Sequence, residues 1–192
     1  SSGTSVIDSS SHGNTGEISA AEWTTGKFNT ALNFDGSSSY VSVRNSDSLD
    51  VSDNSITLSA WINPTSFEGE PWKRILVKEV ENNDAPWTRY ALTQYSGSSQ
   101  LEFSLSGGAK QSVQSSSEIP LGEWTYVTAV YDGSTMSIYI NGVLDNSAIT
   151  SGSITSSNTP FVIGANTEID GEYFNGLIDD VRIFDNALSS VQ

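Results

Sequence analysis

Two tryptophans, each followed two positions later by an arginine, are the residues in this chain best suited to contacting a ligand. They lie in the polar, charged segments Pro71-Trp72-Lys73-Arg74 and Pro86-Trp87-Thr88-Arg89. An indole ring is a flat apolar platform for the C–H face of a sugar, and a guanidinium binds a carboxylate or sulfate through paired hydrogen bonds. Both segments therefore predict contact with a glycan, and the arginines favour an acidic or sulfated one. Tyr95 and Tyr173 are expected to border the same surface.

A structural interpretation of these residues stays open beside the functional one. Both tryptophans can instead close the ends of the fold, and both arginines can pair with Glu79, Glu81 or Asp84. Trp61 and Trp124 belong to strand-like stretches, and we expect them to be structural.

Short runs of alternating apolar and polar residues are the elements that must position these side chains. Alternation with a period of two is typical of half-buried strands, and no long helical period occurs. Asp132-Gly133 and Asn141-Gly142 favour the positive φ of tight reversals between strands. We expect about ten strands in an all-β fold, an antiparallel β-sandwich or jelly roll of two stacked sheets, with residues 1–192 forming one domain. The strand-like runs lie at 32–34, 41–43, 56–62, 75–77, 90–95, 101–105, 124–131, 136–140, 161–163 and 177–184.

The charge balance excludes several partners. Eight basic residues against 23 acidic ones give a formal charge of −15, so binding to nucleic acid or to an anionic membrane surface is not expected. No apolar run reaches the roughly 18 residues of a membrane span. The chain has no cysteine, which excludes thiol chemistry and disulfides. The composition suggests a secreted, extracellular module, although the polar first residues do not form a signal peptide.

Motifs along most of the chain resemble one family. The motifs are Gly26-Lys27-Phe28-Asn29-Thr30-Ala31-Leu32-Asn33-Phe34-Asp35-Gly36, Ile56-Thr57-Leu58-Ser59-Ala60-Trp61-Ile62, Gly122-Glu123-Trp124-Thr125-Tyr126-Val127 and Phe174-Asn175-Gly176-Leu177-Ile178-Asp179-Asp180-Val181-Arg182-Ile183-Phe184. With these motifs the sequence is similar to bacterial LamG-like jelly-roll domains of the concanavalin A-like lectin/glucanase superfamily. The resemblance implies two stacked antiparallel sheets, often a bound calcium ion, and use as a carbohydrate-binding module beside a polysaccharide-degrading enzyme.

The expected function is therefore that of a non-catalytic, monomeric module that binds a polysaccharide and is tethered to the catalytic domain of a larger secreted enzyme. Two alternatives stay open. The first is an adhesin or structural spacer without sugar affinity, since some relatives serve in adhesins. The second is a glycoside hydrolase or polysaccharide lyase.

Calcium is the cofactor that the resemblance implies. Asp179 is in phase with the apolar residues of its strand, where a carboxylate needs hydrogen bonds or a cation. Asp35 at the Asp35-Gly36 turn, and Asp8 and Asn14 in a loop like the family's early Asp/Gly/Asn loop, can add oxygen ligands for a structural ion. Alternatively, Asp179 accepts backbone N–H groups and Asp35 only serves its turn.

An acidic triplet tests the enzymatic alternative. Glu168, Asp170 and Glu172 have the spacing of the catalytic signature of the β-glucanase relatives, and on a strand all three would share one face. Gly171 interrupts that strand, and the triplet directly precedes the last strand-like run rather than lying in a central one. We therefore expect an acidic loop and no catalytic residue, and we expect the single histidine, His12, to be a solvated loop residue.

Overall fold

The computed structural model describes residues 3–51, 54–69, 71–80, 88–106, 110–166, 168 and 171–189. Within these ranges the chain forms fifteen strands and no helix. Accordingly, the described residues contain no helix with the length and apolar character needed to cross a membrane. The strands are β1 (Ser5–Val6), β2 (Gly16–Ser19), β3 (Glu22–Thr25), β4 (Thr30–Asp35), β5 (Tyr40–Val43), β6 (Ile56–Pro64), β7 (Arg74–Glu79), β8 (Thr88–Gln94), β9 (Leu101–Ser106), β10 (Lys110–Gln114), β11 (Thr125–Tyr131), β12 (Thr135–Ile140), β13 (Val143–Ile149), β14 (Phe161–Ile163) and β15 (Asn175–Phe184).

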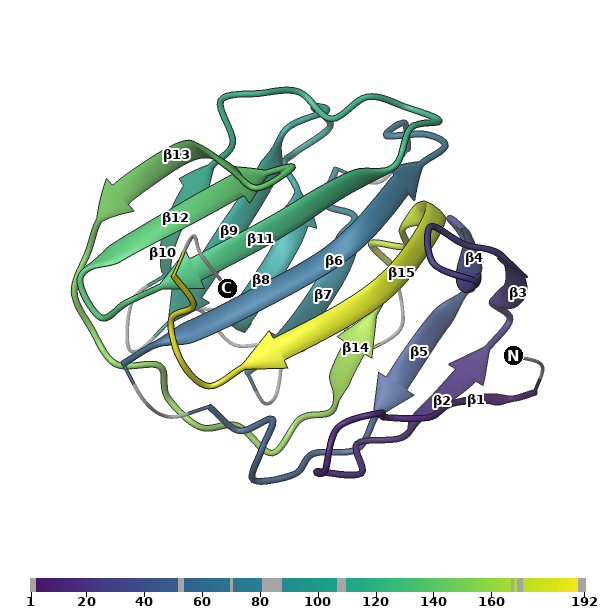
Figure 1. Ribbon diagram of the computed structural model, residues 1–192, viewed down its shortest axis with the longest axis horizontal. Helices are drawn as coiled ribbons and strands as arrows, with labels where there is room; N and C mark the ends of the chain where they lie inside the picture. Colours follow the sequence, from purple (N-terminus) through teal and green to yellow (C-terminus); the bar gives the residue numbers. More distant parts are fainter. Residues whose placement is uncertain are drawn as a thin grey trace.

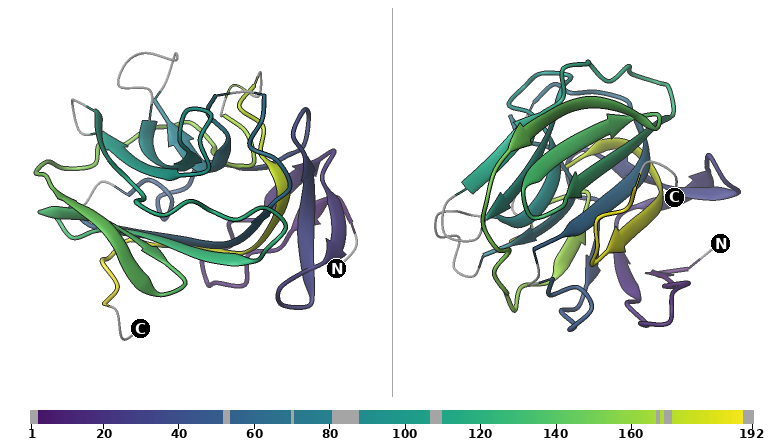
Figure 2. Two further views of the ribbon diagram at one scale, coloured as in Figure 1. Left: turned by 90° about the horizontal axis from the view of Figure 1, so that it is seen from above. Right: turned by 60° about the vertical axis from the view of Figure 1, so that its left-hand side comes forward.

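Two antiparallel sheets make up the fold (Figure 1). The eight-stranded sheet has the order β1-β2-β5-β14-β7-β8-β9-β10, and the seven-stranded sheet has the order β13-β12-β11-β6-β15-β4-β3. Seen from above, the sheets form two stacked layers (Figure 2). The predicted all-β sandwich of two stacked sheets is thereby confirmed.

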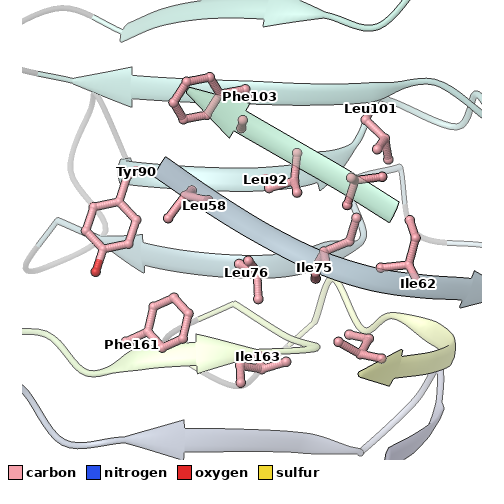
Figure 3. Packing of buried hydrophobic residues seen from close by; sticks show 14 of the residues in the cluster. Leu58, Ile62, Ile75, Leu76, Tyr90, Leu92, Leu101, Phe103, Phe161 and Ile163 are labelled. Carbon is pink, nitrogen blue, oxygen red and sulfur yellow. The ribbon is translucent and has the colours of Figure 1, made fainter. Parts of the chain in front are cut away.

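Side chains that alternate along the strands build the core between the layers. In β6, Ile56, Leu58, Ala60 and Ile62 are fully buried in the main apolar cluster. In the eight-stranded sheet, the side chains of β7, β8, β9 and β14 meet them from the opposite layer (Figure 3). Because successive strand residues point to opposite faces, one face of each strand fills the core and the other faces outward.

Sequence patterning missed five strands, namely β1, β2, β3, β10 and β13. Four of them are edge strands, since β1 and β10 bound one sheet and β3 and β13 bound the other. An edge strand has a neighbour on one side only and tolerates polar residues on both faces, so its alternation is weak. In β13, Val143 is 70% exposed and Ile149 is 92% exposed, so even the apolar residues of this strand do not mark a buried face.

Candidate functional site

Three neighbouring strands place four of the six predicted contact residues at one end of the eight-stranded sheet. β14, β7 and β8 are adjacent and antiparallel, so the end of β14, the start of β7 and the end of β8 lie together. Trp72 lies two residues before β7 and Arg74 is its first residue, while Tyr95 follows β8 and Tyr173 lies between β14 and β15. We call Trp72, Arg74, Tyr95, Glu172 and Tyr173 the Trp72 cluster.

An aromatic pair forms the outer part of this cluster. The ring centroids of Trp72 and Tyr95 are 5.3 Å apart and the rings are nearly perpendicular, at 84°. Both side chains are partly exposed. A backbone hydrogen bond of 2.9 Å from the Gln94 N–H to the Lys73 carbonyl joins the two segments beside the pair. An edge-to-face pair of this kind is a favourable arrangement that leaves ring surface available to a ligand.

The guanidinium of Arg74 lies between two carboxylates. Its Nε donates to Glu172 Oε2 at 2.6 Å, and its Nη2 lies 3.4 Å from Glu79 Oε1. The Arg74 side chain is only 12% exposed, and its backbone N–H donates to the Glu172 carbonyl at 2.9 Å. The sequence alternative in which Arg74 pairs with Glu79 is confirmed. Glu172 is the partner that sequence spacing did not reveal.

Tyr173 packs on the outer face of the eight-stranded sheet. It contacts a second small apolar cluster of fully buried residues from β7, β8, β14 and the residues after β14, namely Val77, Ala91, Val162 and Ala165. Val77, Ala91 and Val162 lie opposite one another across the three strands, with the opposite phase to the core-facing residues. The Lys73 ammonium donates to the Tyr173 carbonyl at 3.4 Å, which ties the tyrosine segment to the start of β7.

The second predicted tryptophan–arginine pair does not join this cluster. Trp87 lies outside the described residues. Arg89 lies near the opposite end of β8, four residues before the position that pairs with Arg74, which is about 13 Å along a strand. Its Nη1 donates to Thr155 Oγ1 at 2.5 Å. Nothing in the described residues therefore brings Arg89 to the ring of Trp72.

Gln94 is a further polar residue at this end of β8. Its side chain is fully buried, and its Nε2 donates to the carbonyls of Phe67 at 3.4 Å and Ser98 at 2.6 Å. Its Oε1 is buried, and no described residue gives it a hydrogen bond. The turn after Tyr95 folds back over this amide and removes it from solvent.

The residues predicted as calcium ligands do not all lie together. Asp35 follows the last inward residue of β4, and its Oδ1 accepts the N–H groups of Ser37, Ser38 and Ser39 at 2.8, 2.8 and 3.1 Å. Burial would raise the pKa of Asp35, but hydrogen bonds from these serines outweigh it and hold the pKa well below its ordinary value. The carboxylate therefore serves its own turn, as the structural alternative proposed.

Asp179 and Asp8 are also occupied by hydrogen-bond donors. Asp179 accepts the N–H of Phe28 on Oδ2 and that of Asp180 on Oδ1, both at 2.8 Å. It lies four residues along β15 from the position paired with Asp35, about 13 Å away. Asp8 accepts the N–H groups of Ser10 and Asn14, both at 2.8 Å.

Asn14 uses its amide to join its own loop to the segment after β5. It donates to Ser48 Oγ at 2.9 Å and accepts from Ser46 Oγ at 2.7 Å. The described residues contain no group of three or more His, Cys, Asp or Glu side chains suited to hold a metal ion. Asp35 and Asp179 lie too far apart to share one ion, and a structural calcium ion stays a prediction.

The two described residues of the acidic triplet do not lie in a strand. Glu168 and Glu172 lie between β14 and β15 and belong to neither strand, while Asp170 lies outside the described residues. Glu172 has a positive φ of 58° and is bound to Arg74. His12 is exposed, as expected for a loop residue.

A second aromatic cluster lies on the outer face of the seven-stranded sheet. Trp61 of β6 contacts Tyr126 of β11 at 5.2 Å and Phe28 at 6.0 Å between ring centroids. The ammonium of Lys27 lies 4.3 Å from the centroid of the indole, within the range of a cation–π interaction. Trp61 is partly exposed, as Trp72 is, but it lies on the other sheet and packs against Phe28, Tyr126 and Lys27, which makes it a useful reference for Trp72.

Comparisons with known proteins agree with this architecture. The family model described as the concanavalin A-like lectin/glucanases superfamily matches residues 35–192. Domain 4 of AbnA, a GH43 extracellular arabinanase from Geobacillus stearothermophilus solved in complex with arabinotriose, has a TM-score of 0.70 and 23% identity, with 92% of this chain and 80% of that chain covered. The binding domain of Paraclostridial Mosquitocidal Protein 1 has a TM-score of 0.76 and 16% identity, with 96% and 47% covered. The binding domain of botulinum neurotoxin serotype G has a TM-score of 0.74 and 17% identity, with 96% and 46% covered.

The chain spans less than half the length of the two toxin-domain chains. No curated protein sequence matches it. At these identities the similarity to the solved structures shows a shared fold. Because the family model covers most of the sequence and the two-layered β-sandwich agrees with it, the chain belongs to the concanavalin A-like lectin/glucanases superfamily.

Proposed function

We propose that the chain is a non-catalytic carbohydrate-binding module that binds a polysaccharide through the Trp72 cluster. The observation that carries this proposal is the perpendicular pair of Trp72 and Tyr95, partly exposed at a sheet end beside Tyr173. Sugars are bound by aromatic rings that pack against their C–H faces and by planar polar groups that hydrogen-bond their hydroxyls. The Trp72 cluster offers both kinds of group.

The charges of the cluster favour a neutral glycan within this class. Arg74 is already bound to Glu79 and Glu172, so an acidic or sulfated sugar would have to displace a carboxylate and leave it without its partner. A sugar hydroxyl can instead donate to a carboxylate or accept from the guanidinium while the ion pair stays intact. Arabinan is the first ligand to test, because domain 4 of the arabinanase was solved with arabinotriose. Acidic and sulfated glycans, which the arginine-rich sequence segments favoured, form the second arm of the test.

The non-catalytic part of the proposal is supported by the state of the acidic residues. Retaining glycosidases hold two carboxylates on opposite sides of the scissile bond, whereas Glu172 is bound to Arg74 and Glu168 is exposed outside any strand. We further propose that the module is monomeric and extracellular and belongs to a larger polysaccharide-degrading enzyme. There it would raise the local substrate concentration for a tethered catalytic domain.

Affinity electrophoresis and calorimetry with soluble glycans test the binding site. On a glycan that the parent protein binds, Trp72→Ala is expected to weaken binding about 30-fold, the cost of losing an aromatic anchor of about 2 kcal/mol. Trp61→Ala is the matched control, since Trp61 lies on the other sheet, and it should leave the affinity unchanged. Equal affinities for parent and Trp72→Ala would remove this cluster from the glycan site. A flat response to neutral, acidic and sulfated glycans would instead favour the adhesin or spacer function.

The hydrolase or lyase alternative has its own assay. Incubation with each bound glycan should release no new reducing ends and no unsaturated products. Release that disappears in Glu168→Gln would show catalysis and overturn the non-catalytic assignment.

A further inference from the structure

A hollow between the two sheets lies away from the Trp72 cluster. It has a cavity volume of about 630 Å³ and is bounded by β1 and the loop after it, by β5 and β14 of the eight-stranded sheet, and by the second half of β15. No residue of the Trp72 cluster lines it. Binding pockets for small molecules have volumes of about 300–1,000 Å³, so this hollow has the size of a ligand site.

The course of β15 explains why the sheets separate here. β4 pairs with β15 only as far as Ile178. Between Asp179 and Arg182 the register with β6 shifts, and Asp180 takes a positive φ of 49°. A bulge bends its strand locally, and bulges are common beside binding sites. The second half of β15 therefore has β6 on one side and the hollow on the other.

Apolar side chains from both layers form the walls. Val41 and Phe161 line the hollow from the eight-stranded sheet and are 0% and 2% exposed. Val181 and Ile183 line it from β15 and are partly buried. In the rest of a sandwich the inner side chains of the sheets interdigitate across about 10 Å. Here the two layers are separated by open space, and the partly exposed side chains of Val181 and Ile183 offer it an apolar side that is suited to the apolar part of a ligand.

The mouth of the hollow carries an excess of negative charge. Asp8, Asp180 and Asp185 line it together with Arg182 and His12. Arg182 is bound to Asp180, with Nη2 to Oδ2 and Nε to Oδ1 both at 3.0 Å. With His12 neutral, three carboxylates and one guanidinium leave a formal charge of −2. A cation is attracted to such a mouth and an anion is repelled.

An exposed apolar residue adds to this opening. Ile7 lines the hollow and is 80% exposed, so an apolar side chain stands in water beside the entrance. A ligand entering the hollow would cover part of it, which is favourable in proportion to the area removed from water.

We propose that this hollow binds a small amphipathic molecule whose apolar body lies between the sheets and whose cationic head group lies among the mouth carboxylates. The apolar walls do not suit a sugar, whose hydroxyls would lose their hydrogen bonds to water there. The site is thus independent of the proposed glycan function. Each can be lost without the other.

Three probes with one tail and different heads test the site. Octyltrimethylammonium, 1-octanol and octanoate share an eight-carbon chain, and each is titrated into the full chain by calorimetry below its micelle-forming concentration. Saturable 1:1 binding of octyltrimethylammonium, at least about fivefold tighter than that of octanoate, is expected from one favourable charge contact of about 1 kcal/mol at an exposed mouth. No saturable binding, or equal affinity for the cation and the anion, overturns the proposal.

Matched variants assign the binding to this mouth. Asp185→Lys should shift the binding preference from octyltrimethylammonium toward octanoate. Ile7→Ser should lower the affinity for all three probes. Both residues are exposed, so the fold should tolerate these changes. Glu123→Lys, with the same charge change on a residue that does not line the hollow, is the control and should behave like the parent. Two further results would overturn the proposal. One is that Asp185→Lys keeps the parent's preference for octyltrimethylammonium over octanoate. The other is a concentration-dependent dimer that blocks binding of the probes.

Discussion

Replacing Asp35 should destabilise the fold through its turn and independently of any metal ion. Oδ1 accepts three successive backbone N–H groups, and Oδ2 accepts the hydroxyl of Ser38 at 2.7 Å. The turn also needs Gly36, whose φ is +76° and whose added Cβ would lie 2.8 Å from Asn175. Asp35→Ala removes the acceptor that holds these groups, while Asp35→Asn keeps one oxygen and loses the charge.

The size of the effect follows from the exposure of this carboxylate. A hydrogen bond to a charged group contributes about 1.5–3 kcal/mol when water is excluded. Asp35 is exposed, so water replaces the lost acceptor, and the comparable loss of a helix N-cap costs about 0.5–2 kcal/mol. We expect Asp35→Ala to lower the free energy of unfolding by about 1–2 kcal/mol and Asp35→Asn by about half of that. For a chain of this length, Asp35→Ala should lower Tm by about 2–8 °C.

Differential scanning calorimetry with and without a chelator measures this effect and tests the calcium prediction. The difference between parent and Asp35→Asn should be the same before and after verified removal of metal. If chelation lowers the parent's Tm to that of Asp35→Asn and abolishes the difference, Asp35 is a calcium ligand and the turn argument is refuted. A calcium site elsewhere would lower both melting temperatures equally, because binding to the folded state stabilises each protein.

Three further changes test other parts of the fold by urea unfolding. Gly164→Ala should cost about 2–3 kcal/mol, since its Cβ would lie 2.4 Å from the buried ring of Phe34 at a φ of +86°; a loss below 1 kcal/mol would contradict this. Tyr90→Phe should cost about 1 kcal/mol, because the buried hydroxyl donates to the Leu49 carbonyl at 2.8 Å, and an unchanged midpoint would show that this bond adds nothing. Side-chain and backbone hydrogen bonds from Ser134 lower the pKa of Asp132, so its contribution is present at neutral pH and is lost as pH falls below about 4. The destabilisation of Asp132→Asn should therefore shrink on acidification, and a constant difference between pH 7 and pH 3 would refute the assignment.

The alternation of β6 shows how far local patterning predicts the fold. Ile56, Leu58, Ala60 and Ile62 point into the core, as their period-two spacing predicted. The burial of Thr57 on the outward face was not predictable in the same way. Its hydroxyl donates to the Asn186 carbonyl at 2.8 Å, and this contact depends on where the segment after β15 lies.

The candidate site was predicted in part. Trp72 was selected as a tryptophan in a polar, charged segment, and Tyr95 and Tyr173 were expected to border the same surface. The structure places all three at one sheet end. The sequence did not decide whether the Arg74 guanidinium is paired within the protein or available to a ligand. Its partner Glu172 is 98 positions away in sequence, and no local pattern links the two residues. The sequence also did not show that Asp35 and Asp179 lie far apart. Both are aspartates, which calcium accepts as ligands, and residue type alone gives no distance.

The sequence by itself determined which faces of the strands are apolar and where tight turns interrupt them, because alternation and positive-φ residues act over a few neighbouring positions. Only the tertiary structure decided that β14, β7 and β8 are adjacent, and this order brings together loops that are far apart in the chain. It also decided that β15 leaves β4 at a bulge and opens a hollow between the sheets. Strand order and the separation of sheets depend on how all layers pack at once, so no local run of residues encodes them.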